Sequence, residues 1–365
     1  MTPLFPTLGI IGLGQIGASI ALAARKAGAS KLILGFDSDE AASAYCQQKG
    51  MIDAIAKPEA MAKDCDLIIL AVPPAAVGAV TKRLIPHLSE HTVITDVASV
   101  KLPVMTYLEN ECPEGIAFIP GHPIAGGTQA GPEGANGAVF ARKLVMLTPP
   151  QGIDIRDPAL ERVRFFWEML DSVVEMMPAE VHDLIYAHVS HLPHAIAYAA
   201  QSCYSNTPEH LQRFLRLAKS DPVLWTDVFM HNQQYTLLAL RNYIAMINHI
   251  AGELTQGAPE EEAKDDVVLA QEVLFPRIAA SCLIATVSML ERQSGQRLAR
   301  YSGAGFADVA SPAATEEPEG DMEQISFHAK AVVEILGRYE QKLESIASAL
   351  ESGQPKQLLS LLEAA

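Results

Sequence analysis

Cysteine and aromatic residues are scarce in this 365-residue chain, and basic residues are outnumbered by acidic ones. The five cysteines form no CxxC pair, which argues against a metal site of the zinc type and against a disulfide framework. A reduced, cytoplasmic setting is therefore the default expectation. The formal net charge of -16, with no stripe of lysine and arginine to offset it, argues against nucleic acid as a partner.

Long apolar runs are also lacking. No stretch of about eighteen apolar residues is evident, so we predict no membrane span and no membrane partner. The N-terminus, MTPLFPTLGIIGLG, lacks the basic start and small-residue cleavage site of a signal peptide. What the chain does have is core-forming material, because 49% of its residues are apolar and its length favours two domains over one.

The first part of the chain, residues 1–152, alternates short apolar runs with helix-like segments. The runs are LGIIGLG, KLILGFD, DLIILAVPP, TVITDVAS and LVMLTPP. Such alternation predicts an α/β fold, namely a Rossmann-type doubly wound parallel sheet. Residues 153–365 have helical apolar spacing, from DPALERVRFFWEMLDSVVEMM onward, and predict an all-α C-terminal domain.

The helical part contains a faint internal repeat. LPHAIAYAA resembles FPRIAASCL, and MHNQQYTLLALRNYI resembles FHAKAVVEILGRYEQ. The two copies would span residues 190–257 and 273–353. Helices built from the same few apolar residues resemble one another easily, so chance is the alternative to duplication.

A GxGxxG pattern lies between the first predicted strand and the first predicted helix. Gly12 permits a tight turn, Gly14 lets the backbone approach a pyrophosphate, and Gly17 allows the helix to pack closely on the strand. Asp37, at the end of the second strand, can accept hydrogen bonds from both adenosine ribose hydroxyls, and it disfavours a 2′-phosphate. We therefore expect NAD rather than NADP; the alternative is a glycine turn that binds nothing.

Two polar residues follow later strands. Ser99 in TDVASVK and His122 in FIPGHPIAGG are both expected at the carboxyl edge of the sheet, where doubly wound folds bind ligands. An imidazole can remove the proton of an alcohol while a serine fixes the oxygen and nicotinamide takes the hydride. The alternative is a histidine whose hydrogen bonds are satisfied within a loop.

Six motifs occur in order: GLGQIGASIA, LAVPP, TDVASVK, PGHPIAG, VSHLPHAIAYA and LAKSDPVLWTDVFMHN. Together they resemble the prephenate and arogenate dehydrogenase family of tyrosine biosynthesis over essentially the whole chain. The resemblance implies NAD-dependent oxidative decarboxylation of a cyclohexadienyl substrate, prephenate or arogenate, to 4-hydroxyphenylpyruvate or tyrosine. Hydride leaves C4 for NAD, carbon dioxide departs and the ring becomes aromatic, so the protein mainly positions and deprotonates the substrate.

The resemblance also implies roles for individual residues. His122 would accept a hydrogen bond from the 4-hydroxyl, Ser99 would hold that hydroxyl, and Arg216 would bind a substrate carboxylate with its planar guanidinium. The further residues implied at the substrate are Ser190, His191, His194, Trp225 and Thr128, and those implied at the cofactor are Gln15, Ile16, Val72 and Pro73. The alternatives are surface pairing for the two histidines of SHLPH, a solvated charge for the arginine and core packing for the tryptophan.

The chain departs from the family pattern in two places. After HPIAG the family usually has Thr-Glu, whereas this chain has GTQ, so a carboxylate at the pocket mouth is missing. The glycine-rich turn and aspartate expected before Arg216 occur instead in YSGAGFADVASP, which contains Asp308 and has Ser311 in the place of the arginine. We therefore hypothesise a partly duplicated substrate module, in which Asp308 could fold back to meet Arg216.

Three further expectations concern function class and assembly. A β-hydroxyacid dehydrogenase would use a lysine on the first long helix of the second domain, but no lysine lies between Lys143 and Lys219. A non-catalytic NAD-binding regulator derived from the family is the alternative from another class. A homodimer through the helical domain is expected, because its apolar faces exceed what one small bundle buries and family members dimerise through these helices.

Overall fold

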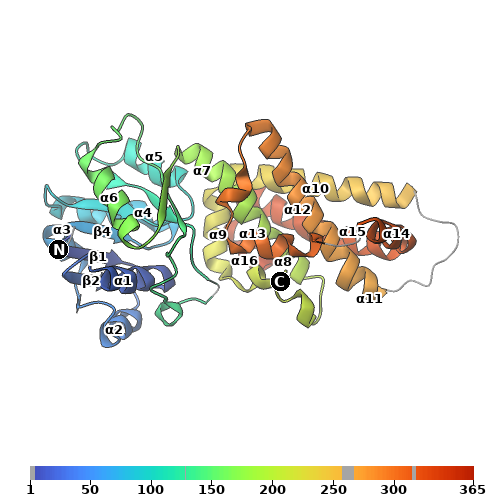
Figure 1. Ribbon diagram of the computed structural model, residues 1–365, viewed down its shortest axis with the longest axis horizontal. Helices are drawn as coiled ribbons and strands as arrows, with labels where there is room; N and C mark the ends of the chain where they lie inside the picture. The colour runs from blue at the N-terminus through green and yellow to red at the C-terminus, as the bar shows by residue number, and fades with distance from the viewer. Residues whose placement is uncertain (1–4, 128, 257–266, 315–317) are drawn as a thin grey trace. The chain divides into compact units, whose positions relative to one another are not determined.

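The computed structural model describes residues 5–127, 129–256, 267–314 and 318–365. The chain divides into unit 1, Met1–Asp183, and unit 2, Leu184–Ala365. Figure 1 labels the α-helices and some of the strands. This division falls later than the predicted boundary between residues 152 and 153. The reason is a strand, β9 (Val173–Met176), which pairs with β8 (Leu144–Leu147) and so belongs to unit 1.

The apolar spacing after residue 157 predicts helix throughout, and this prediction is wrong for the residues that form β9. Helix α6 (Pro158–Met169) ends just before Asp171, which has a φ of 63°, and β9 follows. The β-branched pair Val173 and Val174 favours the extended conformation there.

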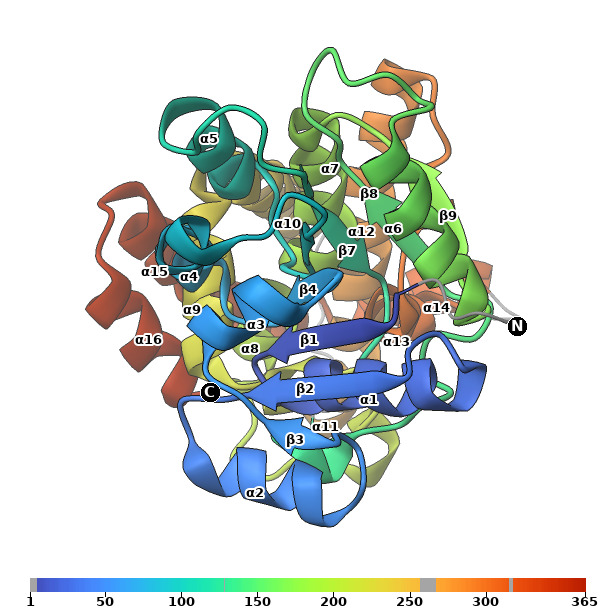
Figure 2. The same ribbon diagram turned by 90° about the vertical axis from the view of Figure 1, so that its left-hand side faces the viewer.

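The main sheet of unit 1 has six parallel strands in the order β3-β2-β1-β4-β5-β6, part of which faces the viewer in Figure 2. This order is that of a Rossmann-type doubly wound sheet, as predicted. The strands are β1 (Thr7–Ile11), β2 (Leu32–Phe36), β3 (Ala54–Ile55), β4 (Leu67–Leu70), β5 (Val93–Asp96) and β6 (Phe118–Ile119).

Helices cover both faces of this sheet, which explains why its strands are continuously apolar. In β4, Leu67 and Ile69 pack into one apolar cluster, and Ile68 and Leu70 pack into another. Besides α6, the helices are α1 (Gln15–Ala27), α2 (Glu40–Gln48), α3 (Pro58–Asp64), α4 (Pro74–Leu84), η1 (Ile85–His87), α5 (Leu102–Asn110) and η2 (Pro132–Gly134), and α7 (Ala179–Tyr186) spans the division between the units.

A second sheet has the order β7-β8-β9, with β7 (Gly121–Pro123) antiparallel to β8. LVMLTPP thus supplies a strand of this small sheet and not of the main one. His122 lies in β7, opposite Met146, and not simply at the carboxyl edge of the main sheet. The proline at 120 has no backbone N–H, which favours the end of β6 at Ile119.

Among its described residues, unit 2 consists of helices and connecting turns, so the predicted all-α C-terminal part is confirmed. Its long helices are α8 (Leu192–Gln201), α9 (Pro222–His231), α10 (Gln233–Gln256), α12 (Phe275–Ser294), α14 (Pro318–Phe327), α15 (Ala329–Glu351) and α16 (Pro355–Glu363). Its short ones are η3 (Ala187–His191) and η6 (Ala270–Leu274), both π-helical, with η4 (Glu209–Leu211), η5 (Arg216–Lys219), α11 (Val267–Leu269), η7 (Leu298–Tyr301), α13 (Ala304–Ala310) and η8 (Ser311–Ala313).

One helical stretch, Val267–Ser294, is long and apolar enough to cross a membrane by length and composition alone. The apolar pattern of the sequence predicts no such span. Because 56% of the residues in its apolar window are buried inside the unit, packing as a core helix accounts for its composition.

Candidate active site

The glycine-rich loop joins β1 to α1 and has the geometry that the sequence predicts. Gly12 has a φ of 94°, and a Cβ on it would lie 2.2 Å from the carbonyl oxygen of Ala71. A Cβ on Gly17 would lie 1.9 Å from the carbonyl oxygen of Gly12, so packing excludes a side chain at both positions. A Cβ on Gly14 would have no neighbour within 4 Å. The first turn of α1 carries no acidic residue and no side-chain cap, which favours an anion there.

Asp37 follows β2 and is held against this loop. Its Oδ2 accepts a hydrogen bond from the backbone N–H of Leu13 at 2.6 Å, and its Oδ1 accepts one from that of Asp39 at 2.9 Å. Val72 and Pro73 follow β4, the other neighbour of β1, and a Cβ on Gly12 would lie 3.2 Å from Cγ1 of Val72. These predicted cofactor residues thus gather where the strand order reverses, the usual ligand position of this fold.

Gln15 and Ile16 also touch another segment. The Oε1 of Gln15 accepts a hydrogen bond from the N–H of Gly127 at 2.9 Å, and a Cβ on Gly126 would lie 3.2 Å from Cδ1 of Ile16. Both residues therefore support the segment that follows HPIAG. The predicted substrate residue Thr128 lies outside the described residues.

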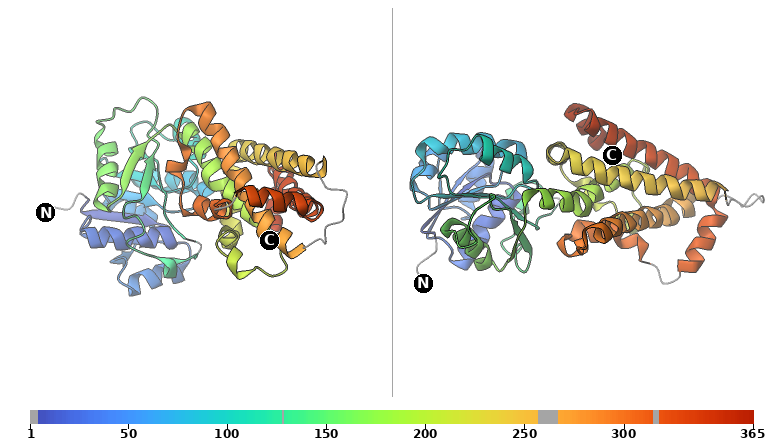
Figure 3. Two further views of the ribbon diagram at one scale, coloured as in Figure 1. Left: turned by 45° about the vertical axis from the view of Figure 1, so that its right-hand side comes forward. Right: turned by 90° about the horizontal axis from the view of Figure 1, so that it is seen from above.

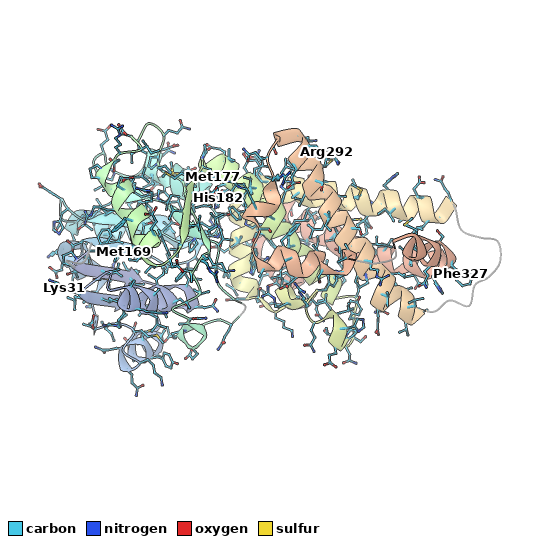
Figure 4. The ribbon with its side chains drawn as sticks, viewed as in Figure 1. Lys31, Met169, Met177, His182, Arg292 and Phe327 are labelled. Atoms are coloured by element: carbon cyan, nitrogen blue, oxygen red, sulfur yellow. The ribbon has the colours of Figure 1, made fainter. Side chains whose placement is uncertain are left out.

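His122 belongs to a chain of three side chains that sequence analysis did not predict. Its Nδ1 lies 2.9 Å from Nε2 of His182, whose Nδ1 lies 2.7 Å from Oδ1 of Asp183. His182, labelled in Figure 4, and Asp183 are fully buried, while His122 is 9% exposed. The only local signal was the adjacent pair His-Asp in EVHDLIY, which lies 60 residues from His122.

This chain fixes the tautomers of both rings. A carboxylate accepts, so His182 donates its Nδ1–H to Asp183 and presents the lone pair of its Nε2 to His122. His122 then donates from Nδ1 and carries its own lone pair on Nε2. Burial, helped by the charge of Lys101, holds the pKa of His182 well below its usual range, so this ring stays neutral.

A buried ion pair ties the loop that contains Ser99 to the strand that contains His122. Lys101 and Asp96 are both fully buried and form an ion pair. The Nζ of Lys101 donates to the carbonyl of Gly121 at 2.6 Å, and Asp96 accepts the N–H of Gly121 at 3.2 Å. Ser99 lies between the two charged residues, beyond the carboxyl end of β5, as predicted. TDVASVK thus contains two supporting residues, Asp96 and Lys101, that sequence analysis did not single out.

Unit 2 brings the predicted residues of SHLPH together with Trp225. The ring of His194 stacks on Trp225, with centroids 3.3 Å apart, and its Nδ1 donates to the carbonyl of Ser190 at 2.9 Å. His191 is fully buried, and its Nδ1 lies 3.2 Å from Oγ1 of Thr236. Neither histidine is a surface residue. The π-helical turn η3 contains Ser190 and His191, and such turns are frequent at functional sites.

Arg216 meets the aspartate of the later motif. Its Nε lies 2.6 Å from Oδ2 of Asp308, while Nε of Arg213 lies 2.8 Å from Oδ1 of the same carboxylate. The side chain of Arg216 is 34% exposed and that of Arg213 is 64% exposed. Asp308, on α13, therefore does fold back to Arg216, and the guanidinium is positioned by a nearly buried carboxylate.

The order of the main sheet and the glycine-rich loop at the start of α1 are those of dinucleotide-dependent dehydrogenases. Residues 20–176 match the family model described as prephenate dehydrogenase, nucleotide-binding domain. Residues 178–264 and 259–364 each match the one described as prephenate dehydrogenase, dimerization domain. The chain therefore belongs to the prephenate dehydrogenase family.

Individual relatives agree with this assignment. The cyclohexadienyl dehydrogenase of Zymomonas mobilis is 31% identical over 66% of this chain and 86% of its own length. The prephenate dehydrogenase of Bacillus subtilis is 31% identical over 68% of this chain and 70% of its own length. The solved prephenate dehydrogenase of Aquifex aeolicus with hydroxyphenyl propionate and NAD+ is 32% identical, with a TM-score of 0.62, and covers 68% of this chain and 91% of its own.

The buried ring of His194 predicts a pH-dependent stability of unit 2. Burial lowers the pKa of His194 to about 3, with a further contribution from the charge of Arg216. Between about pH 6.5 and this value the ring is protonated in the unfolded chain and neutral in the folded one. Stability should fall as the pH drops from 7 to 5, by at most about 2 kcal/mol from this group. Urea unfolding followed by tryptophan fluorescence measures it, in a Trp167→Phe background so that Trp225 is the reporting residue.

The variant His194→Gln is the control for this prediction, because it removes the titrating ring and keeps a polar side chain at the position. Its unfolding free energy should depend less steeply on pH than that of the unmodified chain. Equal pH slopes for the two proteins would contradict the assignment of a buried neutral ring to His194.

Proposed function

We propose that this protein catalyses the NAD-dependent oxidative decarboxylation of prephenate, arogenate or both, yielding 4-hydroxyphenylpyruvate or tyrosine. Its family membership supports the reaction class. The observation that carries the proposal is the chain from Asp183 through His182 to His122, because it directs the lone pair of a catalytic imidazole to Nε2.

The residues of the glycine loop fit NAD. The free space beside Gly14 leaves room for a pyrophosphate at the uncapped start of α1, and Asp37 would accept hydrogen bonds from the ribose hydroxyls of the adenosine. Gln15, Ile16, Val72 and Pro73 would line the same site. When bound, NAD supplies the hydride acceptor of the reaction.

His122 would accept the proton of the substrate 4-hydroxyl at Nε2, and Ser99 would hold the same oxygen. When His122 takes up this proton it becomes positively charged, and its Nδ1–H donates to the neutral ring of His182. The carboxylate of Asp183, bonded to His182, stabilises the positive charge. Removing the hydroxyl proton raises the electron density at C4 and so promotes its oxidation. Loss of carbon dioxide then makes the ring aromatic.

Arg216 would bind a carboxylate of the substrate from unit 2. Asp308 bonds Nε, so the two terminal nitrogens of the guanidinium are suited to a bidentate contact. Ser190, His191, His194 and Trp225 would form the wall of the same subsite, in which a neutral imidazole stacked on an indole suits a flat ring.

The alternatives are weaker on specific grounds. A β-hydroxyacid dehydrogenase would need a lysine on the first long helix of the second domain, and α7, η3 and α8 contain none. A regulator that only binds NAD would have no need for the buried chain that ends at His122.

Assembly and location follow from the family as proposals. The match to a dimerization domain supports pairing between two copies of that domain. The sequence pattern predicts that the two copies belong to different chains, as a homodimer, whereas the two matches within this chain also allow both copies to belong to one chain. A cytoplasmic location fits a biosynthetic dehydrogenase of this kind with five free cysteines.

Replacing the acceptor imidazole tests the proposed chemistry. In His122→Asn the general base is lost, so kcat with prephenate or arogenate should fall about 10²- to 10⁴-fold while NAD binding is kept. Turnover is read from the absorbance of reduced nicotinamide, and NAD binding from calorimetry. The control is His249→Asn, which changes an exposed histidine of α10 and should leave both values unchanged. A kcat for His122→Asn within threefold of the unmodified enzyme would refute the role.

Replacing the guanidinium tests the carboxylate site. Arg216→Ala should lower kcat/KM about 10- to 100-fold, mainly through a higher KM, because a charge-assisted hydrogen bond to the substrate is lost. Arg213→Ala is the matched control, since it removes the more exposed guanidinium from the same carboxylate, Asp308. Equal effects of the two substitutions, or an unchanged KM in Arg216→Ala, would exclude Arg216 as the substrate ligand.

A further inference from the structure

Unit 2 contains the dimerization domain of the family twice. The same family model matches residues 178–264 and again residues 259–364, whereas the Zymomonas and Aquifex relatives cover only about two thirds of this chain. This chain thus carries one copy of the dimerization domain, followed by a second copy of the same domain.

The element order of the two copies agrees. In the first, the π-helical turn η3 runs directly into α8, whose second residue is Pro193; in the second, η6 runs directly into α12, whose second residue is Pro276. Later in each copy a ten-residue helix that begins at a proline, α9 or α14, is followed after one residue by a long helix, α10 or α15.

The two long helices pack on each other as symmetry mates would. Tyr243 of α10 and Tyr339 of α15 are 96 residues apart, and their hydroxyls lie 2.9 Å from each other. The first residues of the two helices, Gln233 and Ala329, have the same separation. In an interface with two-fold symmetry, residues near the axis meet their own equivalents. The tyrosine pair therefore marks a pseudo-two-fold axis, beside which α10 and α15 run along each other (Figure 3).

The buried faces of the helices obey the same relation. Six of the seven buried residues of α10 have a buried equivalent in α15 at the separation of 96 residues. The pairs are Thr236 and Val332, Ala239 and Ile335, Leu240 and Leu336, Tyr243 and Tyr339, Ile247 and Leu343, and Leu254 and Leu350. Across the copies, α10 contacts α12 and α15 contacts α8, which is the exchange that a two-fold axis requires.

The copies differ in the residues that carry chemistry. At the positions of Ser190, His191 and His194, counted from the π-helical turn, the second copy has Val273, Leu274 and Arg277. Conversely, the first copy lacks the aspartate that the second provides, and Asp308 crosses between the copies to bond Arg216 at 2.6 Å. The first copy thus holds the predicted substrate residues of unit 2, and the second copy holds Asp308, the carboxylate that bonds Arg216.

We infer that unit 2 is an internal dimer, in which the second copy takes the place of a partner subunit's dimerization domain and supplies Asp308 to Arg216 within the same chain. The pairing surface along α10 and α15 is thereby covered by the chain itself. One chain is then sufficient for one active site. The part of this inference that concerns the active site rests on the proposed function, and the part that concerns pairing does not.

Two measurements on the full chain test the inference. Light scattering after size-exclusion chromatography should give the mass of one chain, 39.3 kDa, at all concentrations at which turnover is measured. Co-expression of His122→Asn with Asp308→Asn should give no more turnover than the mean of the two variants alone, because each chain keeps its own defect. A site shared between chains would instead combine the intact His122 of one with the intact Asp308 of the other.

A doubled mass together with recovered turnover would overturn the inference. A doubled mass without recovery would overturn the claim that the chain pairs within itself, and would leave only the claim that Asp308 bonds the Arg216 of its own chain. If the unmodified chain does not turn over prephenate or arogenate, the proposed function fails while the mass still decides the pairing: the mass of one chain supports the internal dimer, and a doubled mass overturns it.

Discussion

The direction of one hydrogen-bond chain determines what the candidate active site can do. Asp183 can only accept, so His182 must donate to it, and His122 must in turn donate to His182. Any proton taken up by His122 therefore goes to Nε2. Burial keeps His182 neutral, so the chain orients the imidazole and does not itself store a proton.

The rest of unit 1 keeps this chain in place. Asp183 also accepts the backbone N–H groups of Lys101 and Leu102, both at 2.8 Å, and so anchors the start of α5 to the residue that orients His182. The buried pair of Lys101 and Asp96 fixes Gly121, the neighbour of His122. A buried pair of this kind is costly to break, because the remaining charge would have no partner. The sheet edge, the serine loop and the histidine strand are thus coupled through buried carboxylates.

Local sterics made part of this structure predictable. Gly12 has the positive φ of a tight turn, Gly17 packs on the carbonyl oxygen of Gly12 within that turn, and Asp37 follows the second strand, so the dinucleotide half could be derived from sequence. His182 and Asp183 could not, because their role depends on a contact with a strand 60 residues away. The strand β9 was missed because its neighbours are helical and its pairing partner, β8, is distant in sequence.

The tautomer of His122 is the most direct test of this account. Nitrogen NMR of histidine-labelled enzyme at neutral pH should show His122 protonated at Nδ1 and unprotonated at Nε2, with the signal assigned by its loss in His122→Asn. In His182→Phe the acceptor that faces Nδ1 of His122 is lost, so the proton of His122 should no longer be confined to Nδ1. A proton on Nε2 of His122 in the unmodified enzyme would contradict the account.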